Sequence, residues 1–253
     1  MLKFLGTGSA FNKDMGNTSA YIKDKETLLL IDCGETVFQR IKETSVLEDI
    51  KNVYIVITHN HSDHIGSLGS LVEYLYLIKN IVPNFVLTNA DSAETQEKTL
   101  REYLTSVGVA EDHYEFVYGD MMEDVLPNLT KIELTEVKHS KLLTSYAIEM
   151  YFKDLSIYYL GDHNELSYLK KIIKKLNKND LVYTDCSIRD YKNRIHITLA
   201  ELEEIVEEDK RKQVTCMHFE NYNTYTEAKQ AGFSVANREL SKEELLKHIA
   251  NRT

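Results

Sequence analysis

Proline and glycine, the residues that most often interrupt a folded chain, are scarce in this sequence. Its 253 residues include only 2 prolines and 10 glycines, so no stretch has the composition of a flexible linker between domains. The apolar fraction of 43% is enough for a large hydrophobic core. We therefore expect residues 1–253 to form a single domain.

Cysteine is equally rare, and long apolar runs are absent. The three cysteines, Cys33, Cys186 and Cys216, form no Cys-x-x-Cys pair, and their odd count fits unpaired thiols in a reducing compartment. The opening segment 1–6 has the pattern of a short strand and is too brief for a signal peptide. No apolar run approaches the ~20 residues that a membrane span needs. We expect a soluble, cytoplasmic protein that does not enter a membrane.

Positive charge is in the minority. Lysine and arginine number 30 against 40 aspartate and glutamate residues, which gives a net charge of −10. Stable binding of a nucleic-acid polymer rests on clustered lysine and arginine. The composition therefore argues against a nucleic-acid polymer as a stable partner, but it is compatible with a small anionic substrate held by metal ions.

The most informative stretch is the loop Thr58–Gly66, which follows the apolar run Val53–Ile57. Its ligand-type residues are His59, His61, Asp63 and His64. The apolar run predicts a buried strand, and a helical pattern begins near Leu68. Neutral imidazole and carboxylate groups on one tight loop suit zinc and neighbouring divalent metals. A polar loop that is merely rich in histidine is the alternative, and the spacing favours a metal site.

Further ligand-type residues follow later strands of the chain. His139, Asp162 and His218 each come directly or almost directly after a β-type run. Strands and helices occur in the order strands, helices, strands, helices, with no short internal repeat. This order predicts an α/β fold in which two sheets pack face to face with helices outside, a four-layer αββα sandwich. The polar residues are then expected along one edge of the sandwich.

These seven residues together resemble the metal-binding signature of the metallo-β-lactamase superfamily, in the right order and over nearly the whole chain. The resemblance implies the metallo-β-lactamase fold and two metal ions. The first ion would be held by His59, His61 and His139. The second would be held by Asp63, His64 and His218, and Asp162 would bridge the two.

Two such ions have a clear chemical use. Divalent ions ~3.5–4 Å apart can share a hydroxide and stabilise both the attacking and the leaving oxygen of a phosphoryl centre. Zinc brings the pKa of bound water close to neutral pH. We therefore expect two Zn²⁺ per chain, and because the set contains no thiolate, Mn²⁺ or Fe²⁺ stay open as alternatives.

Within the superfamily, three segments resemble the phosphodiesterase branch that includes ribonuclease Z. They are Phe4–Ser9, Leu30–Glu35 and His196–Glu201, the last opening a helix before His218. In that branch the histidine at the start of this helix assists the leaving group, and a general acid of this kind contributes ~10²–10⁴-fold. His196 is accordingly predicted to be catalytic, with a capping or surface role as the alternative. Asp63 is predicted to help orient or deprotonate the water as well as to bind metal.

The sequence also departs from ribonuclease Z. The bacterial enzyme carries an arm that grips transfer RNA between the positions matching His139 and Asp162, and here only two predicted strands and a turn separate them. The chain thus resembles the compact members of the branch, such as cyclic-nucleotide phosphodiesterases and the phage anti-Pycsar proteins that destroy cyclic-nucleotide defence signals. The predicted reaction is in-line attack of a metal-bridging hydroxide on a small, cyclic nucleotide, with His196 assisting the leaving oxygen.

Three rival functions stay open at this point. The first is a transfer-RNA 3′-processing endonuclease, and the second is a lactonase that uses the same metals. His196 speaks against the lactonase, because metal-bound water alone can open a lactone. The third is a non-catalytic module that sequesters a nucleotide, which the complete set of metal-ligand residues disfavours.

Other residues are weaker candidates. Ser140, just after the third histidine, and Tyr222, just after the last ligand, are predicted substrate contacts, since a tyrosine can stack on a base. Ordinary packing is the alternative for Tyr222. His163 follows the bridging aspartate and either contacts substrate or supports a metal ligand.

Three predictions concern the surface of the protein. His113 and His248 lie in polar surroundings and are predicted to be surface residues. The helix after the metal loop carries Tyr74 and Tyr76 beside its apolar face. The habits of the superfamily make this helix a candidate contact of a homodimer.

Overall fold

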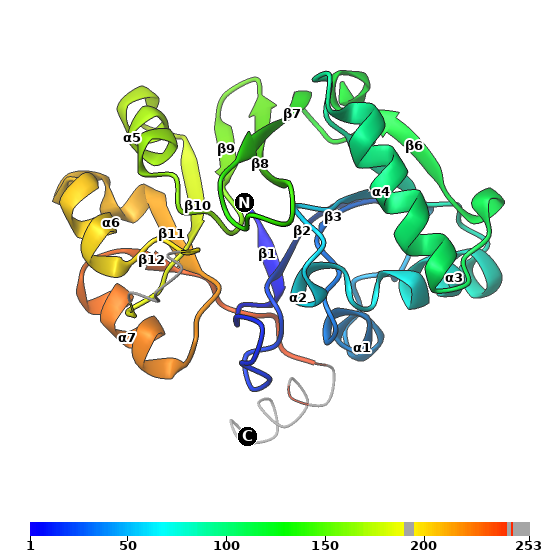
Figure 1. Cartoon of the computed structure of the whole chain (residues 1–253), viewed down its shortest axis with the longest axis horizontal. Helices are drawn as coiled ribbons and strands as arrows, with labels where there is room; N and C mark the ends of the chain where they lie inside the picture. Colours follow the sequence, from blue (N-terminus) through cyan, green and yellow to red (C-terminus); the bar gives the residue numbers. More distant parts are fainter. Residues whose placement is uncertain (190–194, 242–243, 245–253) are drawn as a thin grey trace.

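The computed structural model describes residues 1–189, 195–241 and 244, which form two six-stranded sheets (Figure 1). The first sheet runs in the order β1 (Lys3–Gly6), β2 (Ser19–Asp24), β3 (Thr27–Ile31), β4 (Asn52–Val56), β5 (Asn84–Leu87) and β6 (Glu115–Tyr118). Strands β1 to β3 are antiparallel, and β3 to β6 are parallel.

The second sheet repeats this arrangement. Its order is β12 (Ser234–Val235), β11 (Val214–Met217), β10 (Leu181–Asp185), β9 (Ser156–Tyr159), β8 (Ser145–Phe152) and β7 (Leu129–Val137). Strands β7 to β9 are antiparallel, and β9 to β12 are parallel. Each half of the chain therefore begins with an antiparallel meander and continues in parallel strands, which need crossover connections.

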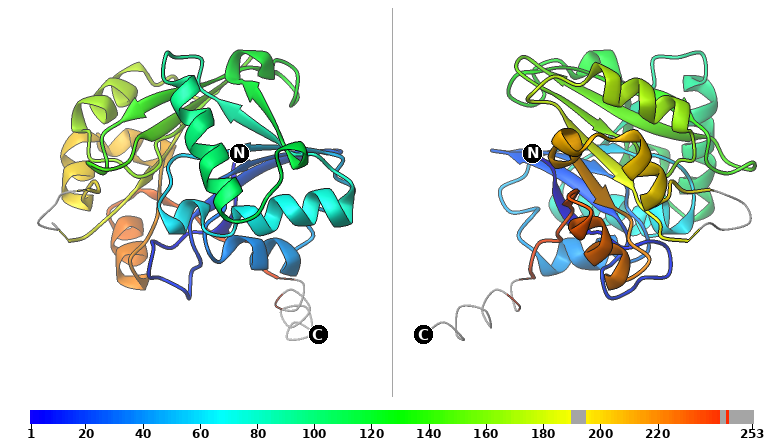
Figure 2. Two further views of the ribbon diagram at one scale, coloured as in Figure 1. Left: turned by 45° about the vertical axis from the view of Figure 1, so that its right-hand side comes forward. Right: turned by 90° about the vertical axis from the view of Figure 1, so that its left-hand side faces the viewer.

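Helices supply these crossovers and cover the outer faces. The α-helices are α1 (Val37–Glu43), α2 (Ser62–Ile65), α3 (Leu68–Lys79), α4 (Ala93–Ser106), α5 (Leu166–Lys175), α6 (Leu199–Ile205) and α7 (Tyr222–Gln230). Short 3-10 turns are η1 (Glu111–His113), η2 (Gly119–Met122) and η3 (Glu208–Gln213). In Figures 1 and 2, α1, α3 and α4 lie on one side of the pair of sheets and α5, α6 and α7 on the other.

Three apolar cores separate these four layers. Strand β3 illustrates the arrangement, because successive side chains of a strand point to opposite faces. Leu28 and Leu30 belong to the outer core beneath α1, α3 and α4. Leu29 and Ile31 belong to the inner core between the two sheets. A third core lies between the second sheet and α5, α6 and α7. The predicted four-layer αββα sandwich is confirmed.

The parallel strands set the position of the site. Strands β3 and β4 lie side by side, as do β9, β10 and β11, and each polar candidate follows the carboxyl end of a strand. Carboxyl ends of neighbouring parallel strands meet at one edge of a sheet, which is where open α/β sheets bind ligands. The packing of the two sheets then brings both edges together.

Several local predictions can be compared with the structure. Helix α3 begins at Leu68, as the sequence predicts. Thr198 caps α6 in a capping box with Glu201, which satisfies two backbone N–H groups. The sequence predicts that Asp91 or Ser92 caps the helix after β5, and Ser92 precedes α4 but makes no side-chain cap. The sequence Ser241-x-x-Glu244 predicts a capping box that opens a last helix, and Ser241 and Glu244 exchange the hydrogen bonds of such a box. The rest of that helix lies outside the described residues, as does His248.

Membrane-spanning helices can be assessed over the same part of the chain. Among the described residues, no helix is both long enough and apolar enough to cross a bilayer.

Candidate metal centre

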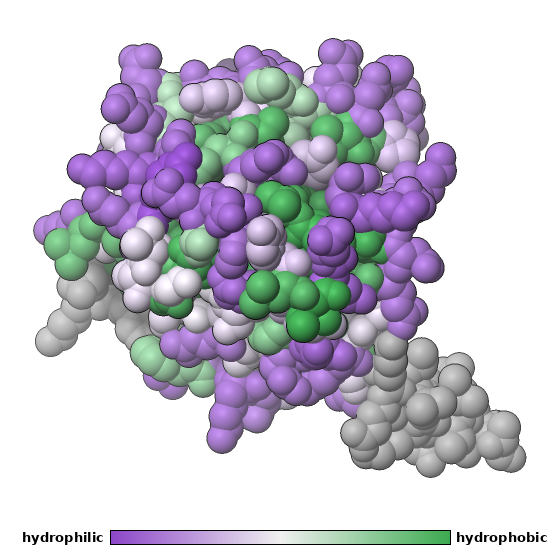
Figure 3. Space-filling model, turned by 90° about the vertical axis from the view of Figure 1, so that its right-hand side faces the viewer, coloured by the Kyte–Doolittle hydropathy of each residue, from purple (hydrophilic) through white to green (hydrophobic). Residues whose placement is uncertain are grey.

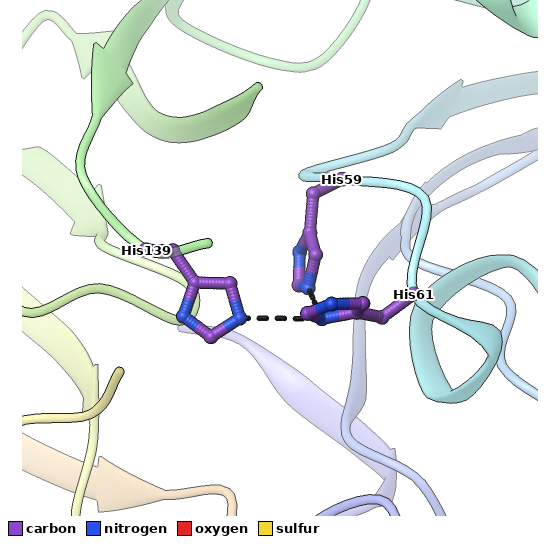
Figure 4. A group of neighbouring side chains, drawn as sticks. All are labelled: His59, His61 and His139. Carbon is purple, nitrogen blue, oxygen red and sulfur yellow. Dashed lines mark hydrogen bonds between the residues drawn. The ribbon is translucent and has the colours of Figure 1, made fainter. Parts of the chain in front are cut away.

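Three histidines from two loops converge at one point of the site (Figure 4). His59 and His61 lie between β4 and α2, and His139 follows β7. Nδ1 of His61 lies 2.9 Å from Nε2 of His59 and 3.2 Å from Nε2 of His139. Three imidazole nitrogens that meet in this way form a common arrangement around a divalent cation.

The protonation of these rings suits metal binding. Nδ1 of His139 donates to the carbonyl oxygen of Ile195 at 2.7 Å, which leaves the lone pair of Nε2 facing the site. Burial lowers the pKa of His59, His61 and His139. Neutral imidazole is the form that binds metal, so all three rings are held in the competent state.

A second group lies beside the first and contains two carboxylates. Asp63 and His64 belong to α2, Asp162 follows β9, and His218 follows β11. Nε2 of His218 lies 3.2 Å from Oδ2 of Asp63 and 3.2 Å from Oδ2 of Asp162. Nε2 of His64 lies 3.4 and 3.3 Å from the same two oxygens. The structure thus brings four of the predicted ligands together in one buried cluster.

Asp162 lies between the two groups. Besides its contacts with His64 and His218, its Oδ2 lies 3.9 Å from Nε2 of His139. Burial opposes the charged form of Asp162, yet the neighbouring histidines hold its pKa well below the usual range. A carboxylate that stays ionised and faces both groups can serve two cations at once.

Asp32 orients His64 from behind, a role that sequence reasoning missed. It directly follows β3, is fully buried and has a left-handed backbone with φ of 63°. Oδ2 of Asp32 lies 2.8 Å from Nδ1 of His64, while Oδ1 accepts from the backbone N–H of Thr58 at 2.7 Å. The contact fixes the proton of His64 on Nδ1 and leaves Nε2 for a metal. In the sequence, the only indication of this role was a lone aspartate at the end of an apolar strand.

Gly34 allows the loop after β3 to lie directly against the metal loop. A Cβ atom at this position would collide with the backbone carbonyl of Asp63. The two loops are also joined by a hydrogen bond from the backbone N–H of Cys33 to the carbonyl oxygen of His64, at 2.7 Å. This close approach is what places Asp32 under His64.

The donor atoms fit one or more divalent cations. Nε2 of His64 and Oδ1 of Asp162 are buried and have no hydrogen-bond partner within the described ranges. Unpaired buried polar atoms are costly, and a cation would satisfy them. All donors are nitrogen or oxygen, and the three cysteines are buried and free of disulfides. This chemistry suits zinc, manganese or iron.

His196 approaches the same cluster from the start of α6. Its Nδ1 lies 2.8 Å from Oδ2 of Asp185, at the end of β10, and 3.9 Å from Oδ2 of Asp162. Burial favours the neutral ring, but the hydrogen bond to Asp185 and the two aspartate charges raise the pKa of His196 to about 9. These contacts favour the charged imidazolium form of His196 beside the metal-type ligands. Asp185, which holds it there, was also missed by sequence reasoning.

His163 is buried behind Asp185 rather than exposed to the site. Its Nε2 lies 3.3 Å from the hydroxyl of Thr184 and 3.9 Å from Oδ1 of Asp185. Of the two roles open to it, support of neighbouring side chains matches this position, because the ring has no exposed surface.

A cavity of about 790 Å³ opens over the cluster. His61, Asp63, His139 and His218 form its floor together with His196, and residues 9–11 form part of its wall. This volume falls within the range of about 300–1,000 Å³ that is usual for small-molecule sites. The cluster is therefore accessible to a ligand of moderate size.

Two predicted substrate contacts lie elsewhere. The hydroxyl of Ser140 accepts from the backbone N–H of Leu142 at 3.2 Å. Tyr222 is 63% exposed and has its ring near that of Tyr225. Among the described residues, neither is part of the cavity wall. Their contact with substrate stays a prediction.

Comparisons with known proteins add the family. The family model of "Anti-Pycsar protein Apyc1" matches residues 1–240. A curated Apyc1 protein of Bacillus phage BSP38 is 27% identical over 237 residues, covering 86% of this chain and 88% of that protein. A second Apyc1 protein, from Saccharibacillus brassicae, is 31% identical over 153 residues, covering 58% of this chain and 62% of that protein.

Solved structures share the fold at low sequence identity. The metallo-β-lactamase fold protein YhfI of Bacillus subtilis superposes with a TM-score of 0.66 at 16% identity, covering 95% of this chain and 96% of that one. The short form of human tRNase Z also gives a TM-score of 0.66 at 16% identity, covering 94% of this chain and 97% of that chain. The metallo-β-lactamase fold predicted from the sequence is thereby confirmed.

Fold, site and family agree on the class of protein. The His/Asp clusters are compatible with bound divalent metal at the strand ends of a metallo-β-lactamase fold, and the chain is a metal-dependent hydrolase. The sequence resemblance to anti-Pycsar proteins is confirmed as well, since the family model spans nearly the full length. The chain belongs to the family of the anti-Pycsar protein Apyc1.

Proposed function

We propose that this chain is a dinuclear metal-dependent phosphodiesterase that hydrolyses small cyclic nucleotides. The observation that carries this proposal is the combination of two adjacent ligand groups with the His196–Asp185 pair on the floor of one cavity. Ester hydrolysis in general needs only the metals, whereas a charged histidine beside them suits a leaving oxygen that must be protonated. The anti-Pycsar name of the relatives supports a nucleotide signal as the substrate.

The ligand groups divide between two ions. His59, His61 and His139 would hold the first, Asp63, His64 and His218 the second, and Asp162 both. When bound, such ions lower the pKa of coordinated water and neutralise charge on phosphoryl oxygens. We propose zinc as the native metal, with manganese and iron as the alternatives that metal analysis of the purified protein would identify.

The protein's own side chains would then handle the protons. Asp63, whose pKa the neighbouring histidines hold far below its usual value against the opposing effect of burial, stays ionised and can orient an attacking water. As the water oxygen bonds to phosphorus, it gives up a proton through Asp63, and the bond from phosphorus to the leaving 3′-oxygen breaks. His196 donates its proton to that oxygen, and Asp185 keeps the imidazolium charged and correctly turned until then.

The alternatives make different demands on the structure. For a transfer-RNA 3′-processing endonuclease, the segment between His139 and Asp162 would need to hold a gripping arm, but β8, β9 and their turn account for it. A lactonase does not require a charged histidine at the leaving group, because metal-bound water alone can open a lactone. We therefore propose a small nucleotide, rather than a stable nucleic-acid polymer, as the partner, and the cytoplasm as its location.

A substrate panel tests this function directly. The metal-loaded protein is incubated with cyclic mono-, di- and oligonucleotides, with precursor transfer RNA and with lactones, and products are separated by chromatography. We expect nucleoside 5′-monophosphates from the cyclic mononucleotides. Cleavage of transfer RNA or of lactones without any mononucleotide product would overturn the proposal.

The homodimer contact predicted on the helix after the metal loop can be narrowed to particular exposed residues of α3. Tyr74 packs on Phe38, with ring centroids 5.5 Å apart, and Tyr76 stacks on His113 at 3.8 Å, so both tyrosines are engaged within the chain. Leu77 and Ile78 of α3 are instead 64% and 67% exposed. Figure 3 shows apolar side chains gathered near the centre of this face, among polar ones. We propose that the α3 face forms the dimer contact.

Light scattering coupled to size-exclusion chromatography tests the contact. The wild-type protein is expected to elute with the mass of a dimer. The double variant Leu77→Glu/Ile78→Lys is expected to elute as a folded monomer, because two charges would be buried in the interface. Met121→Glu, a change at an equally exposed apolar residue of η2, serves as the control and should remain dimeric. A monomeric wild type would contradict the proposal.

A further inference from the structure

One wall of the cavity carries a carboxylate that takes no part in the metal clusters. Glu220 follows the metal ligand His218 by two positions and lines the cavity. The hydroxyl of Ser187 donates to its Oε1 and so fixes that half of the group. Oε2 is shielded from solvent and has no hydrogen-bond partner in the described segments. Such an oxygen is costly to leave unpaired, which points to a donor that arrives with a ligand.

A fully exposed aromatic ring lies on the neighbouring loop. Phe11 is 98% exposed and lines the same cavity. Its loop is attached to the strand end that carries Glu220. The backbone N–H of Ser9 and the side-chain amide of Asn12 both donate to the carbonyl oxygen of Phe219, at 3.0 and 2.9 Å. The ring and the carboxylate are therefore held on adjacent segments of one wall.

Charge decides which part of a nucleotide can lie here. A carboxylate repels phosphate, and the metal-ligand clusters on the cavity floor attract it once their cations are bound. The part of the ligand that faces Glu220 must be neutral and must offer an N–H or O–H donor. An exposed phenyl ring beside it suits a flat, apolar surface, and a nucleobase has both a π-face and donor groups at its edge.

We propose that Phe11 and Glu220 form a nucleobase subsite in which Phe11 stacks on the base and Glu220 accepts a hydrogen bond from an exocyclic amino group. This inference rests on the proposed cyclic-nucleotide hydrolysis and extends it to base preference. The proposal requires the Glu220 side chain to turn so that Oε2 reaches the base while Ser187 retains Oε1. Bases with an amino group at this edge are favoured. A carbonyl oxygen at the same position would be repelled by the carboxylate, because that oxygen carries a partial negative charge.

Two pairs of substrates isolate this contact. Cytidine and uridine 3′,5′-cyclic monophosphates differ mainly by an amino group in place of a carbonyl oxygen, and so do the adenosine and inosine compounds. The wild-type protein is expected to show kcat/KM on the order of tenfold higher for the amino member of each pair, the scale of one hydrogen bond to a charged group. In Glu220→Gln both ratios should fall to about twofold or less, because a side-chain amide can turn to meet either group.

Matched variants distinguish the contribution of Glu220 from that of Phe11. Glu35→Gln removes the same charge from another exposed carboxylate of the cavity and is expected to leave both ratios unchanged. Phe11→Ala should raise KM for all four substrates by the same factor, roughly tenfold, with little change in kcat. Phe11→Trp should restore KM. Thermal unfolding of each variant reports whether it has folded, and the wild-type ratios test the idea without any variant.

The outcomes distinguish this inference from the function on which it rests. Equal rates within both wild-type pairs would overturn the base subsite and leave the phosphodiesterase intact. A Glu220→Gln variant that loses activity equally on all four substrates would also overturn it, since that pattern indicates contact with the sugar or a role in folding. Hydrolysis of none of the four by the metal-loaded protein would overturn the proposed function itself.

Discussion

Replacing His196 with alanine is expected to lower kcat for cyclic-nucleotide hydrolysis by roughly 10²–10⁴-fold, the usual contribution of a general acid. Nδ1 of His196 lies 2.8 Å from Oδ2 of Asp185 and 3.9 Å from Oδ2 of Asp162, so the proton on Nε2 is the one proposed to reach the leaving oxygen. Metal content should be unchanged, because the proposed ligand groups are complete without His196, although its ring could form a third group with His139 and Asp162. A loss of metal from this variant would instead indicate that His196 is a ligand. Steady-state kinetics with elemental analysis of the same sample would measure both quantities.

Two further variants show whether the histidine acts as a proton donor. Asp185→Asn keeps the ring but removes the charge that holds its proton, so we expect a loss in kcat smaller than that of His196→Ala. His113→Ala removes a histidine that stacks on Tyr76 away from the cavity and should leave kcat near that of the wild type. If His196→Ala hydrolyses its substrate at the wild-type rate, the leaving group needs no acid, and the lactonase alternative gains support.

Replacing Asp162 with alanine is expected to have the largest effect on the metal centre itself. Oδ2 of Asp162 lies 3.3 Å from His64, 3.2 Å from His218 and 3.9 Å from His139, between the two ligand groups. Its loss would remove negative charge from between the two proposed cations, so both should bind more weakly. We expect fewer than two ions per chain and a fall in kcat/KM of roughly a thousandfold or more, since several kcal/mol of charge stabilisation depend on the metals.

Metal analysis after extensive dialysis provides the measurement for Asp162→Ala, with activity assayed before and after added zinc or manganese. Asp120→Ala, at an exposed aspartate in η2, is the matched control and should retain the wild-type metal content. Asp32→Asn should give an intermediate result, because outer ligands typically affect metal affinity by about 10–100-fold. Two tightly bound ions in Asp162→Ala would show that this carboxylate does not bridge them.

The fold was largely predictable because its signals are local. Alternating or continuous apolar runs identify strands, and helical periodicity identifies helices such as α3, which begins at Leu68 as expected. The order of these elements then limits the architecture to few possibilities. A cap of α4 by Asp91 or Ser92 is predicted from residue type, but Ser92 makes no side-chain cap, since a polar residue near a helix start can cap it only if its rotamer and the preceding backbone allow.

The candidate site was predictable to the extent that its chemistry depends on residue type. Imidazole and carboxylate groups that follow strands have few uses as specific as metal binding, so the residues that converge in the two groups could be named as candidate ligands from the sequence. The roles of Asp32, Asp185 and Glu220 carried no such signal. Buried or cavity-lining aspartate and glutamate residues are common, and only their distance from a particular histidine or hydroxyl gives them a function.

The loop from His59 to His64 shows most clearly what each level decides. The sequence by itself predicts that this loop carries metal ligands, because four donor groups lie on one short turn after a buried strand. The tertiary structure alone decided how they are divided and oriented. The packing of two sheets brings His139, Asp162 and His218 to the loop, and Asp32 and Ile195 turn the rings of His64 and His139. Those contacts join residues distant along the chain, so only the folded protein can specify them.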